Sequence, residues 1–326
     1  MYKKHIYTPL ETATAGYKEA ERIKNSTGVG ISMPEIPGLI VPIDKYFARV
    51  MPWELVVVLG QPHNGKSMFL NWWERGICDQ LKREARDDEV VVHVSHEESL
   101  EALSFQEHSR ITGIPIEDIG SGKADLARLR WSTNIIAGIN IYRIADSLQT
   151  GDDAPPLTLS NVYRMIKSLK TGEVLGKPVK IAVVFMDYLQ TFPVDEEVTN
   201  SGVLSQRREQ VKNDVYRMRR MLTWLEAPII CASQAKQKLD NPRPPYFIPS
   251  ISDGSEAKEI AEKPDRNLGI WMPKVKDYRI GETVPELGTI TEEMCYVRVN
   301  KQRGGFPSGN VFPCRWDYGK GKLFAL

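Results

Sequence analysis

The stretch Gly60-Gln61-Pro62-His63-Asn64-Gly65-Lys66-Ser67 matches G-x-x-x-x-G-K-[ST], the pattern of the phosphate-binding P-loop. Before it, Leu55–Leu59 is an apolar run typical of a buried strand, and after it Met68–Gln80 has the composition of a helix. A P-loop needs both neighbours, because the loop has to join the end of a strand to the start of a helix. A Gly-rich strand-to-helix turn without a ligand is the alternative interpretation.

In a P-loop the glycines let backbone N–H groups close around phosphates, and the helix N-terminus adds its positive dipole end. We therefore expect the segment from Gly60 to Met68 to bind the phosphates of a nucleotide. Lys66 would contact the terminal phosphates, and Ser67 would hold Mg²⁺.

The composition describes a globular protein of one large or two ordinary domains. The chain has 326 residues, 41% of them hydrophobic, and a mean hydropathy of −0.34. Its 43 basic and 42 acidic residues nearly balance, so contacts with nucleic acid have to come from local clusters. No apolar run approaches the roughly 18 residues of a membrane span, and no signal-peptide core follows Lys3-Lys4. We expect a cytoplasmic protein without a membrane partner.

The four cysteines, Cys78, Cys231, Cys295 and Cys314, lie far apart, with no C-x-x-C pair and no His at ligand spacing. A zinc site is therefore not expected. We interpret these residues as buried or scattered thiols in a reducing compartment.

From Pro52 onward, short apolar runs alternate with helical stretches, which is the pattern of βαβ units and a parallel sheet. The expected strands are Leu55–Leu59, Val90–Val94, Ile139–Ile144, Ile181–Met186 and Ile229–Ala232, with weaker candidates at Leu268–Met272 and Tyr296–Asn300. The expected helices are Met68–Leu81, Leu100–Ile111, Leu159–Leu169 and Gln206–Leu225. The pattern predicts an α/β fold with a mostly parallel central sheet flanked by helices.

A further helix is expected near the N-terminus, at Leu10–Asn25, followed by a Pro-rich segment. Its apolar positions are few, so it either lies on its own domain or docks on another subunit. We divide the chain into residues 1–45, a linker helix with a connecting arm, and residues 46–326, the nucleotide-binding domain.

Three of the expected strands end in polar side chains, where open α/β sheets bind ligands. Ile181–Met186 runs into Asp187, a rigidly held carboxylate suited to the Mg²⁺ shell. An ordinary strand that ends in an exposed Asp is the alternative.

The other two strand ends also carry candidate site residues. Val90–Val94 leads into Ser95-His96-Glu97-Glu98-Ser99, where Glu97 could orient and deprotonate the attacking water, or could simply begin the next helix. Ile229–Ala232 leads into Ser233-Gln234, and Gln234 could sense a γ-phosphate or belong to a simple turn.

Taken in order, the segments GQPHNGKS, VVHVSHEES, VVFMDYLQTF, IICASQAK and VRVNKQRGG resemble the ATPase domain of the DnaB-type replicative DNA helicases, within the RecA-like P-loop family. The resemblance runs from about Leu10 to the end. It implies a RecA-like ATPase core, the metal role for Asp187 and the catalytic role for Glu97.

Lys301-Gln302-Arg303-Gly304 resembles the K-x-R-x-G segment of that family, from which Lys and Arg reach the nucleotide of the neighbouring subunit. The resemblance implies Arg303 as an arginine finger, with Lys301 beside it; a basic β-hairpin on the surface is the alternative. An in-trans finger requires a repeated head-to-tail interface, and the family implies a hexameric ring. The early helix would then pack on the adjacent subunit.

The loops after Gln190 and Gln234 correspond to those that touch single-stranded DNA in the family, although basic loop residues are often merely solvated. The DNA-binding candidates are Arg207, Arg208, Lys236, Lys238 and Arg243. Only about fifty residues precede the P-loop, so binding of a primase or loader through an N-terminal domain is in question, and the chain resembles a divergent, phage- or mobile-element-encoded version.

The resemblance implies an ATP-dependent, ring-forming helicase or translocase on single-stranded DNA. The alternative is an ATPase of the RecA or KaiC kind, a recombinase or nucleotide-switched assembly protein that never unwinds DNA.

Overall fold

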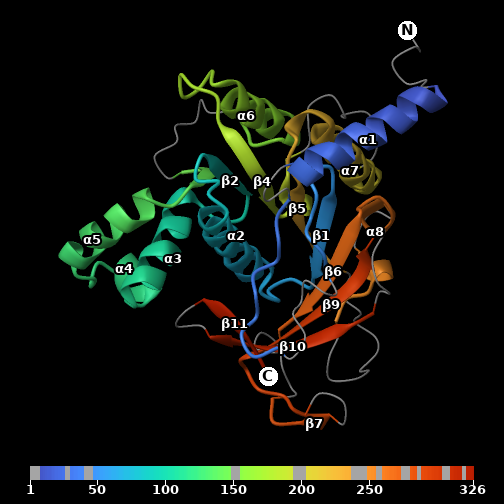
Figure 1. Cartoon of the computed structure of the whole chain (residues 1–326). Coiled ribbons are helices and arrows are strands. Elements are labelled where there is room, and N and C mark those ends of the chain that lie inside the picture. Colours follow the sequence, from blue (N-terminus) through green and yellow to red (C-terminus); the bar gives the residue numbers. More distant parts are fainter. Residues whose placement is uncertain are drawn as a thin grey trace.

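A computed structural model describes residues 8–25, 30–39, 47–147, 155–193, 203–235, 248–254, 259–272, 280–284, 288–302, 309–317 and 321–326. Within this part of the chain, nine strands form one sheet in the order β11-β10-β9-β6-β1-β5-β4-β2-β3 (Figure 1). Strands β6 to β3 in that order are parallel, and β9, β10 and β11 extend the sheet in antiparallel fashion. The mostly parallel central sheet expected from the sequence is thereby confirmed.

The strands of the large sheet are β1 Leu55–Gly60, β2 Glu89–Ser95, β3 Ile141–Ile144, β4 Lys180–Asp187, β5 Ile229–Gln234, β6 Arg266–Trp271, β9 Met294–Gln302, β10 Val311–Asp317 and β11 Lys322–Ala325. A separate small ribbon pairs β7 Thr283–Val284 with β8 Gly288–Thr289. All seven expected strands are present, and the sequence pattern did not predict β7, β8, β10 or β11.

The helices are α1 Pro9–Asn25, α2 Lys66–Arg83, α3 Leu100–Thr112, α4 Ile116–Gly120, α5 Leu126–Ala137, α6 Leu159–Thr171, α7 Val203–Leu225 and α8 Glu259–Glu262, with short 3-10 turns at Leu189–Thr191 and Ile251–Asp253. Side-chain caps begin several of them: Ser99 accepts from the Ala102 amide at α3, and Thr158 accepts from the Asn161 amide at α6. The expected helices are confirmed; α4, α5 and α8 were not predicted.

Both faces of the parallel strands are buried, which explains their unbroken apolar runs. On β1, Val56 and Val58 face a core that includes Trp73 of α2, while the alternate residues Leu55, Val57 and Leu59 face a second core that includes Val215 of α7. Figure 1 shows α2 on one side of the sheet and α6 and α7 on the other. The strand ends are therefore held rigidly between two helical layers.

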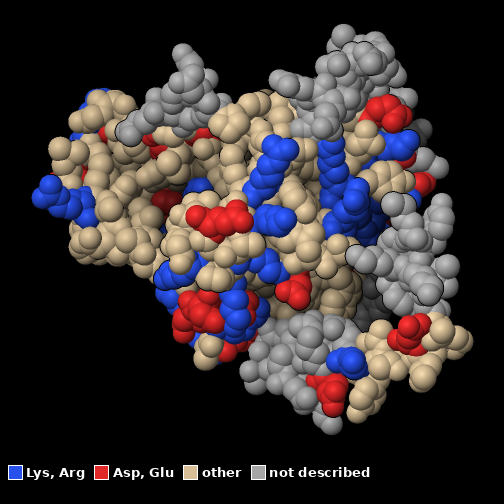
Figure 2. Space-filling model, turned by 90° about the horizontal axis from the view of Figure 1, so that it is seen from above, with Lys and Arg blue, Asp and Glu red and all other residues tan. Residues whose placement is uncertain are grey.

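Charged side chains do not form a uniform coat. Figure 2 shows Lys and Arg intermingled with Asp and Glu on the face seen from above. This agrees with the formal net charge of +1. Contacts with a polyanion therefore have to come from local groups of basic residues.

Part of the N-terminal arm is packed against the nucleotide-binding domain. Ile31, Met33 and Ile36 belong to the same apolar core as α2. These residues lie inside the segment that the sequence pattern interprets as a connecting arm. Burial of three apolar side chains ties this stretch of the arm to the domain.

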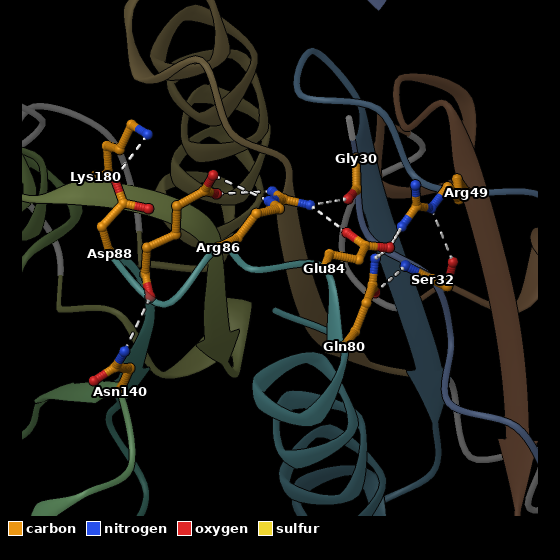
Figure 3. Close-up of polar contacts among 10 residues, drawn as sticks. Gly30, Ser32, Arg49, Gln80, Glu84, Arg86, Asp88, Asn140 and Lys180 are labelled. Atoms are coloured by element: carbon orange, nitrogen blue, oxygen red, sulfur yellow. Dashed lines mark hydrogen bonds and ion pairs between the residues drawn. The ribbon is translucent and has the colours of Figure 1, made fainter. Parts of the chain in front are cut away.

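Polar contacts fix the same stretch to the end of α2 (Figure 3). The Ser32 amide donates to Gln80 Oε1 at 2.8 Å, and Arg86 Nη1 donates to the Gly30 carbonyl at 3.0 Å. Glu84 accepts from Arg86 Nη1 and from Gln80 Nε2, each at 3.0 Å. These contacts attach the arm to the C-terminal end of α2.

Helix α1 buries none of its described side chains. Residues 8–18, 20 and 21 are all exposed, and the exposed fractions of Leu10 and Tyr17 are 76% and 67%. The helix expected at Leu10–Asn25 is therefore present, but those of its apolar side chains that the structure describes, such as Leu10 and Tyr17, are not covered by the described part of this chain.

Helices α3, α4 and α5 form a unit that stands away from the sheet in Figure 1. On α5, Leu126 and Trp131 are exposed by 79% and 57%. This unit follows directly after the loop that carries Glu97.

All four cysteines are free and buried, which confirms the expected buried thiols. Burial raises the pKa of the thiols of Cys78 and Cys314 to about 12. In the described part of the chain, no group of three or more His, Cys, Asp or Glu side chains is placed to hold a metal ion. Nor does any described helix combine the length and apolar character needed to cross a membrane.

Candidate active site

The P-loop joins β1 to α2 as its sequence predicts. Gly65 caps α2 in the left-handed region with φ 71°, which favours glycine, and its carbonyl accepts from the Phe69 amide at 2.9 Å. At Gly60, a Cβ would lie 2.8 Å from Cγ of Lys66. Glycine is required there because the stem of the lysine passes directly over it.

A pocket of about 390 Å³ lies beside the loop. It is lined by Pro62, His63, Asn64, Gly65, Lys66, Ser67, Met68, Glu97, Glu98, Tyr188 and Gln234. The fold therefore brings together the P-loop, the Glu97 loop and the end of β5, three segments that are far apart in the sequence.

Lys66 is buried at the base of this pocket. Its Nζ donates to the Gln61 carbonyl at 3.0 Å and lies 5.5 Å from the ring centroid of Tyr188. Burial lowers the pKa of Lys66, and the nearby carboxylates of Asp187 and Glu97 act in the opposite direction. The ammonium group is thus held in a poorly solvated position where a phosphate oxygen would be a strong partner.

Asp187 ends β4 and is 2% exposed. The Ser67 hydroxyl donates to its carboxylate, while its Oδ1 has no hydrogen-bond partner among the described residues. Burial raises the pKa of Asp187, since nothing but the hydrogen bond and more distant cations compensates the charge. A hydroxyl and an under-satisfied carboxylate are the oxygen donors that Mg²⁺ takes, so these residues fit the ion expected from the sequence.

The loop after β2 presents two carboxylates to the pocket. The Ser95 hydroxyl accepts from the Glu98 amide at 3.1 Å and donates to the Glu98 carbonyl at 3.0 Å. Helix α3 begins only at Leu100, with Ser99 as its cap. Glu97 is therefore an exposed residue of the loop, outside the first helical turn, and the idea that it merely begins the helix does not fit.

Gln234 stands at the end of β5, level with Gly60 on β1. Its amide donates to Gln190 Oε1 at 3.0 Å, and Gln190 Nε2 donates to the Ser233 hydroxyl at 2.8 Å. These two hydrogen bonds hold the end of β5 in place, so Gln234 does not belong to a simple turn. The sequence analysis did not predict Gln190 as a site residue, although Gln190 is the last residue of the segment Asp187-Tyr188-Leu189-Gln190 on which the family resemblance partly rests.

Lys301 is not near the pocket of its own chain. On β9 it is paired with Asn267, which is in turn paired with Val57 of β1. Val57 precedes Gly60 by three residues, or about 10 Å along the strand, and the P-loop continues away from it. The Lys301 Nζ donates instead to the Glu262 carbonyl at 2.7 Å.

For several predicted site residues the structure describes no side chain. Arg303, Lys236, Lys238 and Arg243 lie outside the described residues, and Arg207 and Arg208 lie in α7 without described side chains. Tyr188 and Glu98 line the pocket but were not predicted to do so. For Tyr188, its place directly after the metal-binding Asp187 is the signal that could have identified it.

Strand β1, the P-loop and helix α2 together present a buried lysine and a hydroxyl, and a carboxylate at the end of another strand lies beside them. This arrangement defines a P-loop nucleotide-binding protein with a RecA-like fold. The sequence profile of the DnaB-like helicase C terminal domain matches residues 36–312. The chain belongs to this family.

Individual relatives agree with this assignment. The replicative DNA helicase DnaB of Helicobacter pylori (strain ATCC 700392 / 26695) is 23% identical over 290 residues, covering 86% of this chain and 53% of the relative. The chain therefore spans about half the length of that curated relative.

Two solved structures share the fold. An ATPase domain superposes with a TM-score of 0.70 at 18% identity, covering 96% of this chain and 98% of that one. A DnaB-like replicative helicase, described with its interactions with primase, gives a TM-score of 0.69 at 17% identity and covers 98% and 72%. At these identities the likeness shows the fold alone.

Proposed function

We propose that this protein is an ATP-driven motor that assembles into a ring, hydrolyses ATP at subunit interfaces and unwinds DNA by translocating on single strands. One observation supports it most directly. Lys66, Ser67, Glu97 and Gln234 line a single pocket, with Asp187 hydrogen-bonded to Ser67, in a chain of the DnaB-like family. We infer ATP and Mg²⁺ as the cofactors.

The residues divide the chemistry among them. Lys66 binds the terminal phosphates, and Ser67 and Asp187 would hold Mg²⁺, which neutralises developing phosphate charge when bound. Glu97 orients a water and accepts its proton as the water oxygen attacks the γ-phosphorus. The bond from that phosphorus to the bridging oxygen then breaks, which leaves ADP and phosphate. Gln234, held by Gln190, senses the γ-phosphate.

The subunit interface completes the site. Lys301 lies toward the edge of the sheet away from its own P-loop, which supports the proposal that it serves the nucleotide of a neighbouring copy. We assign Arg303, two residues further, the role of the finger in trans. A closed hexameric ring supplies such an interface at every subunit.

Uncovered apolar side chains are consistent with assembly. Leu10 and Tyr17 of α1 are exposed, and we infer that residues 1–45 dock on the adjacent subunit while residues 46–326 form the ATPase domain. The basic residues Arg207, Arg208, Lys236, Lys238 and Arg243 would contact single-stranded DNA in the ring. A primase or loader is a further partner that the family suggests, and the cytoplasm is the expected compartment.

The test measures ATPase activity with and without single-stranded DNA, and then strand displacement on forked duplexes that carry one or the other tail. We expect DNA to stimulate turnover and one fork to be unwound. Turnover indifferent to DNA, with no displacement on either fork, would contradict the proposal.

Electron microscopy with a non-hydrolysable ATP analogue provides an independent check. Closed six-membered rings are expected. Extended filaments on DNA would instead indicate a recombinase.

Replacement of Glu97 by glutamine is expected to preserve ATP binding and to lower the hydrolysis rate by about a hundredfold or more, because the amide cannot accept the proton of the attacking water. Steady-state turnover and equilibrium binding of an ATP analogue separate the two effects. Glu117→Gln, the same change at an exposed position of α4, serves as the control. Normal turnover in Glu97→Gln would show that the base is wrongly assigned.

A further inference from the structure

The second carboxylate of the Glu97 loop is tied to two helices through a chain of side chains. Glu98 Oε1 accepts from Gln106 Nε2 of α3 at 2.6 Å. Gln106 Oε1 in turn accepts from Asn71 Nδ2 of α2 at 3.1 Å. Asn71 lies four residues after Ser67, one helical turn further along the same side of α2. The contacts therefore run from the P-loop helix, through α3, back to the pocket.

Glu97 lacks such contacts. Its carboxylate is exposed and makes no hydrogen bond to another described residue, so its position depends on the loop that carries it. That loop is fixed at Glu98, by Ser95 on the backbone and by Gln106 on the side chain. Burial raises the pKa of Glu98, and the hydrogen bond from Gln106 acts in the opposite direction.

Charged side chains attach helix α3 to α2 and to β3. Of its residues, all of which are described, Leu103, Glu107 and Thr112 are buried. Glu107 pairs closely with Arg75 of α2 and lies 3.5 Å from Arg143 Nη2 of β3. The carboxylate of Glu107 thus anchors the helix at one point, and Gln106 makes the contact nearest the pocket.

We propose that Asn71, Gln106 and Glu98 form a positioning relay that sets the loop carrying Glu97 against the P-loop helix. Gln106 and Glu98 are then positioning residues for hydrolysis, and the seating of the α3–α5 unit governs the geometry of the site. This inference rests on the proposed ATPase activity.

The relay predicts a specific kinetic pattern. Gln106→Leu removes both hydrogen bonds and is expected to lower kcat about tenfold while leaving the KM for ATP within about twofold, because Lys66 and Ser67 bind the phosphates independently. Glu98→Ala is expected to have a similar effect. Glu98→Gln keeps an acceptor oxygen for Gln106 and should retain most of the activity.

A double-mutant cycle sharpens the test. Glu98→Ala combined with Gln106→Leu should be no worse than either change alone, since each already breaks the relay. Asn134→Leu, an amide-to-leucine change at an exposed position of α5, controls for the substitution, and thermal unfolding checks that every variant is folded.

Each outcome is decisive. The inference is overturned if Gln106→Leu changes only the KM for ATP, if its kcat stays within twofold of the wild type, or if Glu98→Gln is as impaired as Glu98→Ala. A wild-type protein without ATPase activity would overturn the proposed function itself, and the inference with it.

Discussion

Replacing Lys66 with alanine is expected to lower ATP turnover at least about a hundredfold and to weaken ATP binding. The reason is electrostatic: the ammonium group is buried beside the loop, so a charge-assisted contact to a phosphate is little screened by water. Burial also lowers the pKa of Lys66, which means that the folded chain gains little from this charge in the absence of ligand. The variant should therefore remain as stable as the wild type. Steady-state turnover, titration with an ATP analogue and thermal unfolding test these three expectations.

The control for this change is Lys180→Ala. Lys180 forms an exposed ion pair with Asp88 at 2.8 Å, and exposed pairs contribute little to stability. Both variants lose one lysine, but only the first loses a residue that lines the pocket. Equal turnover in the two variants would show that the P-loop does not bind the substrate phosphates.

The sequence predicts the centre of the sheet well because those strands are buried on both faces. Leu55–Leu59 and Ile181–Met186 are continuous apolar runs within β1 and β4, and such runs are recognisable without knowledge of the partners. Strand β10 was not predicted, because it is not a continuous apolar run. Its residues Val311–Asp317 alternate between buried and less buried positions, and they include Pro313. Helix α5 was not predicted because its apolar side chains, among them Leu126 and Trp131, are exposed and form no buried stripe.

Within the site, too, residues that form a local pattern in the sequence are predicted, whereas residues brought together only by the fold are not. The P-loop residues are consecutive in the sequence, so their spacing alone predicts their chemistry. The residues around Glu97 are equally compatible with the start of a helix, and only the cap at Ser99 shows that α3 begins later, at Leu100. Asn71, Gln106 and Glu98 come from different elements, and no local pattern marks a contact that depends on how two helices are seated. Likewise, only the antiparallel register of β9 shows that Lys301 is remote from its own P-loop.

Arg303→Ala is expected to lower the turnover of the assembled protein by about a thousandfold or more, the range by which an arginine finger accelerates phosphoryl transfer. Nucleotide binding by each subunit should persist, because the P-loop of the same chain is intact. Turnover is measured above the concentration at which rings form, and binding is measured by titration with an ATP analogue. Arg315→Ala, which removes an exposed arginine from the neighbouring strand β10, is the matched control.

Mixing shows whether the finger acts between subunits. In a ring assembled from Arg303→Ala and Lys66→Ala chains, an interface works only where an intact P-loop of the first chain meets an intact Arg303 of the second. Random assembly of equal amounts places that combination at up to about one quarter of interfaces, so turnover should rise well above that of either variant alone. A finger acting within its own chain would give no recovery at any ratio. The remote position of Lys301 favours recovery, since this residue lies two strands away from β1 and about 10 Å back along the strand direction from the level of Gly60, at the edge of the sheet away from the P-loop.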